Sequence, residues 1–276
     1  MSEYLLKEAL RHLTNILVAE YKVRLMADWQ YRFQQSLGLM GLMFEAVIYL
    51  VVWTTVAESQ GGEVGGFTAA ELAGYYIGWM LVRNITTGWS PQWFEYRIRE
   101  GEFNTALLRP IHPYFPDISH MMAGKTAGMI TLLPTMAILA LIFQPEVNFV
   151  AWSLIAMVPA LILAFLLRYT LMYVWALTAF WTTRITALFE LYFALEFFFS
   201  GRIAPLALLP DWAQRIALYT PFPWTFAFPL ELMLGRLTPN EALFGFAVQA
   251  VWLTIAVIAV RVVWRRAIKH YSAVGG

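Results

Sequence analysis

The chain has 276 residues, of which 60% are hydrophobic and 13% are charged, and its formal net charge is +1. A soluble domain has roughly 45–50% apolar and about 25% charged residues, so this composition excludes a soluble protein. The small net charge excludes a strongly basic nucleic-acid-binding protein. The absence of cysteine excludes disulfides and thiolate metal sites. We therefore predict an all-α integral membrane protein.

Residues 1–33 precede the first long apolar stretch, and we expect them to form a cytoplasmic amphipathic helix. Leu6, Leu10, Leu13 and Leu17 recur at helical spacing, and the basic residues lie away from this stripe. We expect the helix to lie along the inner leaflet; packing on a soluble partner is the alternative. No uncharged apolar core is present here, so we expect no cleaved leader.

Six stretches are expected to cross the membrane, because a spanning helix needs about 20 mostly apolar residues. The expected spans are about 34–57, 69–89, 117–143, 149–181, 185–200 and 242–264. Arg168 interrupts the fourth stretch, which we interpret as one long helix that ends near Trp181. A break at Arg168 is the alternative.

Lysine and arginine gather before the first span, between the second and third spans, and after the sixth. The positive-inside rule therefore predicts that both termini are cytoplasmic. Arg202, Arg215 and Arg236 run against this bias, because they fall in a segment expected on the outer side. We predict a multi-pass protein of the plasma membrane, most simply a bacterial cytoplasmic membrane.

Among the charged residues within the expected spans, five are candidates for a function, namely Glu45, Arg83, Arg168, Glu190 and Glu196. Charges inside a bilayer are costly, which makes such residues functional candidates. At a rise of about 1.5 Å per residue, Glu45 and Arg83 fall at similar depths. We predict that these two form a pair; each lining a watery path alone is the alternative. The same arithmetic places Arg168 and Glu196 at similar depths.

Enzyme motifs are incomplete in this sequence. Gly124-Lys125-Thr126 is similar to the end of a phosphate loop, but Ser119 stands where that loop requires glycine. An apolar helix follows it and no strand precedes it. We interpret Lys125 as a residue that reaches the cytoplasmic headgroups. We expect no catalytic residue, metal site or cofactor in this chain.

The segment 90–110, between the second and third spans, predicts a short exposed cytoplasmic helix. Ser90 is a good N-cap, Pro91 suits the first helical position, and Gly101 suits the left-handed residue that ends a helix. Aromatic residues and charges of both signs suit docking into a groove of a soluble partner; a solvated loop is the alternative. The candidate docking residues are Trp93, Glu95, Arg97, Arg99, Glu100, Gly101, Glu102, Arg109 and Pro110.

The segment 201–240, after the fifth span, is apolar but broken. Gly201, Pro205, Pro210 and Pro221 divide it into pieces that are too short to cross a bilayer. We expect re-entrant helices that dip into the outer leaflet and are shielded by protein. A cap on the outer surface is the alternative.

In their order, these elements resemble the permease subunits of type-2 ABC exporters. The resemblance is carried by Glu100–Phe103 with Leu107–Pro110, by Phe180-Trp181, and by Ser200–Leu206 with Leu209–Trp212. Each motif alone is loose, but together they cover essentially the whole chain. The charges in the fifth span depart from the pattern of that family and leave the role of this span in the translocation path open.

The resemblance implies one permease of an ATP-driven exporter. Two such permeases, identical or sister proteins, form the translocation path in the lipid bilayer, and separate ATP-binding subunits hold ATP and Mg²⁺. The segment 91–110 is then the coupling segment, and the outer pieces close the exit. The alternative is an ATP-independent channel or ion-coupled transporter that uses the intramembrane charges. The sequence shows no inverted repeat, which weighs against secondary transport.

Overall fold

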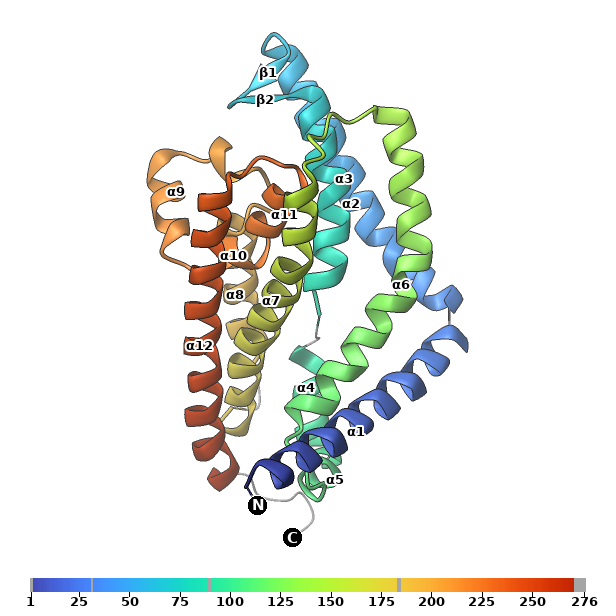
Figure 1. Cartoon of the computed structure of the whole chain (residues 1–276), viewed down its shortest axis with the longest axis vertical. Helices are drawn as coiled ribbons and strands as arrows, with labels where there is room; N and C mark the ends of the chain where they lie inside the picture. The colour runs from blue at the N-terminus through green and yellow to red at the C-terminus, as the bar shows by residue number, and fades with distance from the viewer. Residues whose placement is uncertain (1, 31, 89–90, 183–184, 271–276) are drawn as a thin grey trace.

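The structure is a computed structural model that describes residues 2–30, 32–88, 91–182 and 185–270. It is almost entirely helical, and most of its long helices run along the long axis of the molecule, while the N-terminal helix lies oblique to that axis (Figure 1). Within the described residues, four helices are long and apolar enough to cross a bilayer. These observations confirm the prediction of an all-α membrane protein.

The elements follow one another along the chain with short connections. The first half contains α1 (Ser2–Gln30), α2 (Arg32–Ser59), β1 (Glu63–Val64), β2 (Phe67–Thr68), α3 (Ala69–Thr86), α4 (Pro91–Arg99), α5 (Glu102–Leu107) and α6 (Tyr114–Phe143). The second half contains α7 (Ala151–Ala176), the 3-10 turn η1 (Leu177–Phe180), α8 (Thr186–Phe199), η2 (Leu206–Leu208), α9 (Asp211–Leu218), α10 (Phe222–Thr225), α11 (Ala227–Met233) and α12 (Pro239–His270).

The helices lie over the expected stretches, but they do not all have the length and hydropathy of a span. The qualifying helices of the described chain are Met40–Ser59 of α2, α6, α7 with η1, and α12. Helix α3 has 18 residues and contains both Glu71 and Arg83. Helix α8 has 14 residues, a length of about 21 Å at 1.5 Å per residue. The structure thus supports four spans by length and composition, where the sequence predicts six.

Helix α7 continues without interruption past Arg168. It runs from Ala151 to Ala176, and η1 extends it to Phe180. This confirms one long fourth helix ending near Trp181 and contradicts a break at Arg168. The charge is accommodated because the guanidinium finds a buried carboxylate, as described for the site below.

Helix α3 occupies the centre of the molecule. Thr68 and Glu71 form a capping box that fixes its start. Its aromatic residues Tyr75, Tyr76 and Trp79 are fully buried, and α2, α6, α7 and α11 pack against it. One of the three buried clusters of the described residues is therefore built around this short helix, and the other two lie against α7.

The backbone that follows α8 is held by aromatic side chains of α2 and α3. Four N–H or O–H groups donate to the three successive carbonyls of residues 201–203. The donors and acceptors are Tyr75 to Gly201 at 2.6 Å, Trp79 to Arg202 at 2.9 Å, Tyr76 to Ile203 at 2.9 Å, and Trp53 to Ile203 at 3.0 Å. An irregular backbone can stay buried when its polar groups are satisfied in this way.

Glycine and proline break the segment 201–240 into short helices, as predicted. Gly201 adopts a φ of 89° directly after α8. Pro205, Pro210 and Pro221 each stand immediately before the next helical piece, at η2, α9 and α10. Residues 222–230 are buried, so protein shields this part of the segment.

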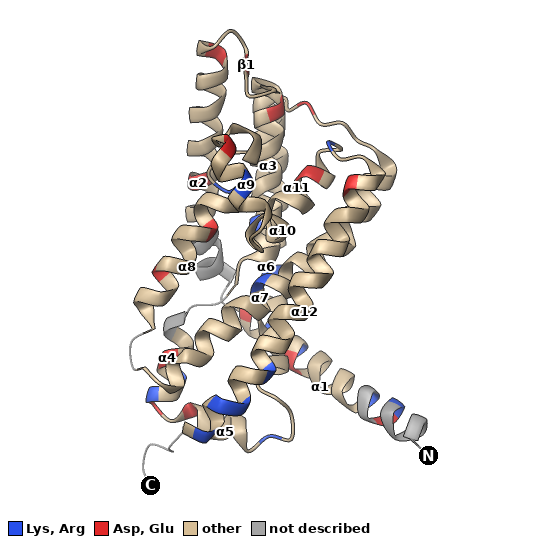
Figure 2. Ribbon diagram, turned by 90° about the vertical axis from the view of Figure 1, so that its left-hand side faces the viewer, with Lys and Arg blue, Asp and Glu red and all other residues tan. Residues whose placement is uncertain are grey.

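One end of the molecule carries α4, α5 and the last part of α12, and we call it the basic end. The start of α1 lies there as well, while the hairpin of β1 and β2 lies at the opposite end (Figure 1). Figure 2 shows lysine and arginine gathered around α4, α5 and the end of α12, while acidic residues occur at both ends. This distribution matches the one from which the sequence predicts a common side for both termini.

Helix α1 packs along α6 in the same chain. Glu20 accepts a hydrogen bond from Arg109 at 2.8 Å, and its other oxygen lies 2.9 Å from Nε2 of His120. The hydrogen bond with His120 is the main cause that lowers the pKa of Glu20. Val23 and Met26 are exposed on this helix, which suits the expected position along a lipid surface.

Replacing Tyr75 with Phe keeps the ring and removes the hydroxyl that donates to Gly201. The carbonyl left behind is buried, so we expect the free energy of unfolding to fall by about 1–3 kcal/mol, measured by titration with a denaturing detergent. Tyr219 is 85% exposed, and Tyr219→Phe is the matched control, expected to change stability by under about 0.5 kcal/mol. Equal effects of the two substitutions contradict a stabilising role for the hydrogen bond.

Candidate functional site

Helices α4 and α5 form a helical hairpin at the basic end. The predicted short helix is confirmed, since α4 spans Pro91–Arg99. Gly101 follows with a φ of 74°, the left-handed conformation expected of it, which glycine adopts without steric cost. The predicted N-cap, Ser90, lies outside the described residues.

One face of this hairpin is buried against the rest of the molecule. Phe94 and Phe103 are fully buried, and their ring centroids lie 5.3 Å apart. Phe94 also contacts Tyr173 of α7, and Phe103 contacts Phe180 of η1 and Trp264 of α12. These aromatic contacts join the hairpin to α7 and α12. The sequence analysis did not identify them, because Phe94 and Phe103 stand in a segment rich in charges.

Arg97 is not part of the exposed face, and the expectation that placed it there is wrong. It is 8% exposed, and its Nη1 donates to both carboxylate oxygens of Asp117, at 2.9 and 3.0 Å. Its guanidinium lies over the rings of Trp93 and Phe103, at 4.5 and 5.3 Å from their centroids. The chain turns back after α5 and brings the start of α6, with Asp117, against α4. Arg97 therefore fastens the hairpin to α6.

The opposite face of the hairpin is open to solvent. Trp93 is 40% exposed and Tyr96 is 44% exposed. Arg99 and Glu100 pair with each other at 3.2 Å, with both side chains exposed. Leu108 projects from the end of α5. The surface therefore offers aromatic, aliphatic and charged groups of both signs.

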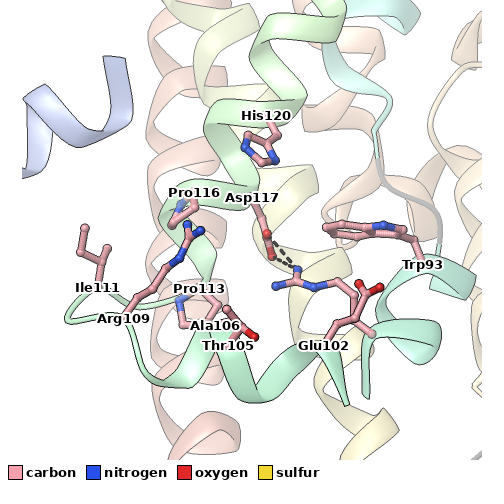
Figure 3. A pocket seen from close by; sticks show the side chains of 11 residues that line it. Trp93, Glu102, Thr105, Ala106, Arg109, Ile111, Pro113, Pro116, Asp117 and His120 are labelled. Atoms are coloured by element: carbon pink, nitrogen blue, oxygen red, sulfur yellow. Dashed lines mark hydrogen bonds and ion pairs between the residues drawn. The ribbon is translucent and has the colours of Figure 1, made fainter. Parts of the chain in front are cut away.

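A cavity of about 340 Å³ lies between α4, α5 and the start of α6. Figure 3 shows the side chains of Glu102 and Arg109 on two sides of this space, with His120 above it and dashed lines ending on Asp117. The residues that line it are Trp93, Arg97, Glu102, Thr105, Ala106, Arg109, Ile111, Pro113, Pro116, Asp117 and His120. Of the remaining docking candidates, Glu95 is half-buried and Pro110 is exposed. The cavity has room for a side chain of a docked protein.

His112 lies at the turn between α5 and α6, beside this cavity. Its ring centroid is 4.2 Å from that of Trp264 of α12. Burial lowers the pKa of His112, so the ring is neutral at pH 7. A neutral ring can stack on Trp264 without the cost of burying a charge.

Within the expected spans, the charged residues form a connected set of ion pairs. Glu45 pairs with Arg83, as predicted. Arg168 pairs with Glu196 at 2.6 Å, which agrees with their similar predicted depth. Arg202 lies between the two pairs, 3.5 Å from Glu45 and 3.9 Å from Glu196. We call these five residues the charge network.

The charge network does not include Glu190, which was a candidate, and it includes Arg202, which was not. Glu190 is exposed on α8 and makes no ion pair in the described part of the chain. Arg202, which runs against the positive-inside bias, is 7% exposed and faces carboxylates. Arg202 follows Glu196 by only six residues. Because the chain can fold back against the last turns of a helix that has just ended, this short separation could have identified Arg202 as a partner of Glu196.

Lys125 does not reach towards headgroups, so that interpretation is wrong. Its ammonium donates to the backbone carbonyls of Asn84, at 2.8 Å, and of Thr87. These carbonyls end α3, and a positive charge at a helix C-terminus is favourable. Lys125 therefore caps α3 from α6.

Metal ligation finds no support in the part of the chain that the structure describes. No group of three or more His, Asp or Glu side chains is close enough there to hold a metal ion. The arrangement combines a fixed hairpin with an exposed face, and a buried network of ion pairs. Its evident capacities are protein docking and the mechanical linkage of helices.

Glu196 and Glu190 lie on the same helix, and only Glu196 is buried. Glu196→Gln leaves Arg168 without its carboxylate, so we expect the free energy of unfolding to fall by about 3–5 kcal/mol. Glu190→Gln is the matched control and should change it by under about 0.5 kcal/mol. Both are measured by unfolding in detergent, together with the yield of folded protein. A stable Glu196→Gln protein refutes the structural role of this pair.

Comparison with known proteins accounts for most of the chain. A search among curated proteins found no match. The profile described as ABC-2 family transporter protein matches residues 43–275. The match begins in α2 and includes the hairpin of α4 and α5, the charge network and the broken segment after α8. The chain therefore belongs to the ABC-2 family of transporter proteins and is a permease of an ABC transporter.

Proposed function

We propose that this permease exports its substrate with energy from ATP that separate subunits hydrolyse while docked on the hairpin of α4 and α5. The observation that carries the proposal is the division of this hairpin into two faces. Phe94 and Arg97 hold one face to the membrane helices. Trp93, Tyr96 and Arg99 are exposed on the other. A segment that transmits the movement of a bound subunit needs an exposed face to bind that subunit and a buried face in contact with the membrane helices.

Contacts of the hairpin lead to three long helices. The ion pair of Arg97 and Asp117 reaches α6, and the aromatic contacts of Phe94 and Phe103 reach α7 and α12. Because packed interiors are dense, a displacement of the hairpin is passed on to helices in contact with it. A movement of a docked subunit thus reaches helices that cross the bilayer.

In this proposal the basic end faces the cytoplasm, with both termini, because lysine and arginine favour that side. Six segments, including the short α3 and α8, then lie across the bilayer, and α1 lies along the inner leaflet. A second copy or a sister permease completes the translocation path. The pieces from η2 to α11 lie re-entrant at the exit side. The membrane is the plasma membrane, of a bacterial cell in the simplest case.

The structure weakens the reason for considering an ion-coupled transporter. That reading depends on the five intramembrane charges. Four of them are paired, with one another or through Arg202. Pairing of buried charges is what a low-dielectric environment requires, so these residues have a structural explanation. Family membership favours the ATP-driven reading.

Charge reversal at Arg99 or Glu100 tests the docking surface. Both side chains are exposed, so we expect normal membrane expression. We also expect a loss of copurifying ATPase of about tenfold or more, because removing one partner of a hydrogen-bonded charge pair that docking buries costs about 2–5 kcal/mol. Arg97→Gln is the contrasting variant, since it leaves buried Asp117 unpaired and should lower expression itself. If Arg99→Glu and Glu100→Lys keep full ATPase binding and export, the hairpin is not the docking site.

Gly101→Val tests the same surface by another route. Its φ of 74° is a conformation that a β-branched residue rarely adopts. The substitution should therefore displace α5 from α4 and reduce ATPase binding. Asn104 is the nearest neighbour of a Cβ placed at Gly101, at 3.6 Å, so a loss of function is attributable to backbone strain and not to a clash.

Purified alone, this chain should hydrolyse no ATP above background. The reason is the incomplete phosphate loop, in which Ser119 replaces glycine and Lys125 caps α3. Hydrolysis is measured in detergent with and without copurified partner subunits. Sustained hydrolysis by a preparation free of other proteins overturns the assignment of ATP to partner subunits.

A further inference from the structure

An open cavity of about 270 Å³, with both apolar and polar groups in its lining, lies between α2, α3 and α6. Its polar lining comes from Arg83, Asn84 and Thr87 of α3 and from Lys125 of α6. These residues belong to or adjoin helices that form the centre of the permease. A single water needs only about 10–15 Å³ of such space, so the cavity is large enough for a small charged group.

The two basic side chains of this cavity remain partly open to it. Arg83 uses Nη1 to bind Glu45, and 19% of its side chain is still exposed in the cavity lining. Lys125 donates to the carbonyls of Asn84 and Thr87. An ammonium has three donors, so one N–H group is not used by these two carbonyls, and Nζ lies 5.4 Å from the ring centroid of Phe165.

Positive charge is in excess around the cavity. The charge network contains three arginines and two glutamates. Lys125 joins it through Thr87, whose hydroxyl accepts from Arg168 at 2.8 Å. Lys125 makes no ion pair in the described part of the chain. The connected set therefore carries four positive and two negative formal charges.

Neighbouring acidic groups do not remove this excess. Asp28 of α1 lies near the cavity wall at Gly124, but it is paired with Arg24 at 3.0 Å. Lys125 is half-buried and binds carbonyls but no carboxylate among the described residues, and a charge shielded from water is most stable beside an opposite charge. A bound anion in contact with Arg83 and Lys125 supplies the missing negative charge.

We propose that this cavity binds a phosphate group of the exported substrate. Phosphate oxygens accept several charge-assisted hydrogen bonds at once, from arginine, lysine, amide and hydroxyl donors, which are the groups lining the cavity. The phosphate is carried either by a lipid-like amphiphile or by a soluble phosphate compound. This inference rests on the proposed export function and specifies its substrate class.

The test is a binding measurement on the purified full chain in an uncharged maltoside detergent. Dodecyl phosphate is titrated by calorimetry against the wild type, Lys125→Gln and Arg83→Gln. We expect each substitution to weaken binding by about tenfold or more, because each removes a charge-assisted hydrogen bond. Lys269→Gln makes the same change at an exposed residue of α12 and should leave binding unchanged.

Two further ligands separate the outcomes. Competition by inorganic phosphate supports the site and assigns it to a soluble phosphate compound, whereas binding of dodecyl phosphate alone supports it and assigns a lipid-like amphiphile. Dodecyltrimethylammonium has the same chain with a positive charge, and equal affinity for it in the wild type overturns the proposal. So does equal binding by Lys125→Gln and Lys269→Gln. If Lys125→Gln and Arg83→Gln do not fold, the comparison of the two ligands in the wild type still decides.

Copurification of the ATPase is scored separately on the same variants. Absence of phosphate binding with intact ATPase association overturns the phosphate site and leaves the exporter proposal standing. Phosphate binding by a chain that recruits no ATPase supports the site and overturns the exporter proposal.

Discussion

Arg202 stands between Glu45 and Glu196, and much of the membrane region depends on this bridge. Charges buried away from water must be paired, so α2, α3, α7 and α8 have to lie where their charges meet. The same residue is fixed a second time, since its carbonyl accepts from Trp79. Side chain and backbone of one residue thus connect the end of α8 to the central helix α3. The irregular backbone directly after α8 can therefore stay buried, because the carbonyls of residues 201–203 all accept hydrogen bonds.

The hairpin of α4 and α5 shows how a short segment at the basic end can be fixed on one face and exposed on the other. Arg97 is bound by a carboxylate and two aromatic rings, so it cannot also serve a partner. Its neighbours Tyr96 and Arg99 face away and remain available. Adjacent residues of an α-helix point about 100° apart, so the buried residues and the exposed residues of α4 lie on different faces. The 9 residues of α4 thus supply one buried face and one exposed face.

The sequence predicted those features that depend on local pattern or on helix rise. Long uncharged runs give helices, glycine and proline divide the segment after α8, and Glu45 and Arg83 meet because their distances along two antiparallel helices match. The position of Arg97 could not be predicted in this way, since its partner Asp117 belongs to the next helix. Lys125 was misread for the same reason, because its acceptors are backbone carbonyls at the end of α3. Which residues of different elements meet is decided by tertiary packing, which local periodicity does not encode.

The 14 residues of α8 have a further consequence for the surrounding lipid. Its outward side carries an apolar stripe at helical spacing, formed by Leu188, Leu191, Leu195 and Phe198. A helix of this size is about 21 Å long, whereas the hydrocarbon layer is about 30 Å thick. The apolar surface that α8 offers to lipid is therefore shorter than the apolar surface of α12. A bilayer that meets this side has to become thinner locally, at a cost of fractions of a kcal/mol per ångström, unless another polypeptide covers it.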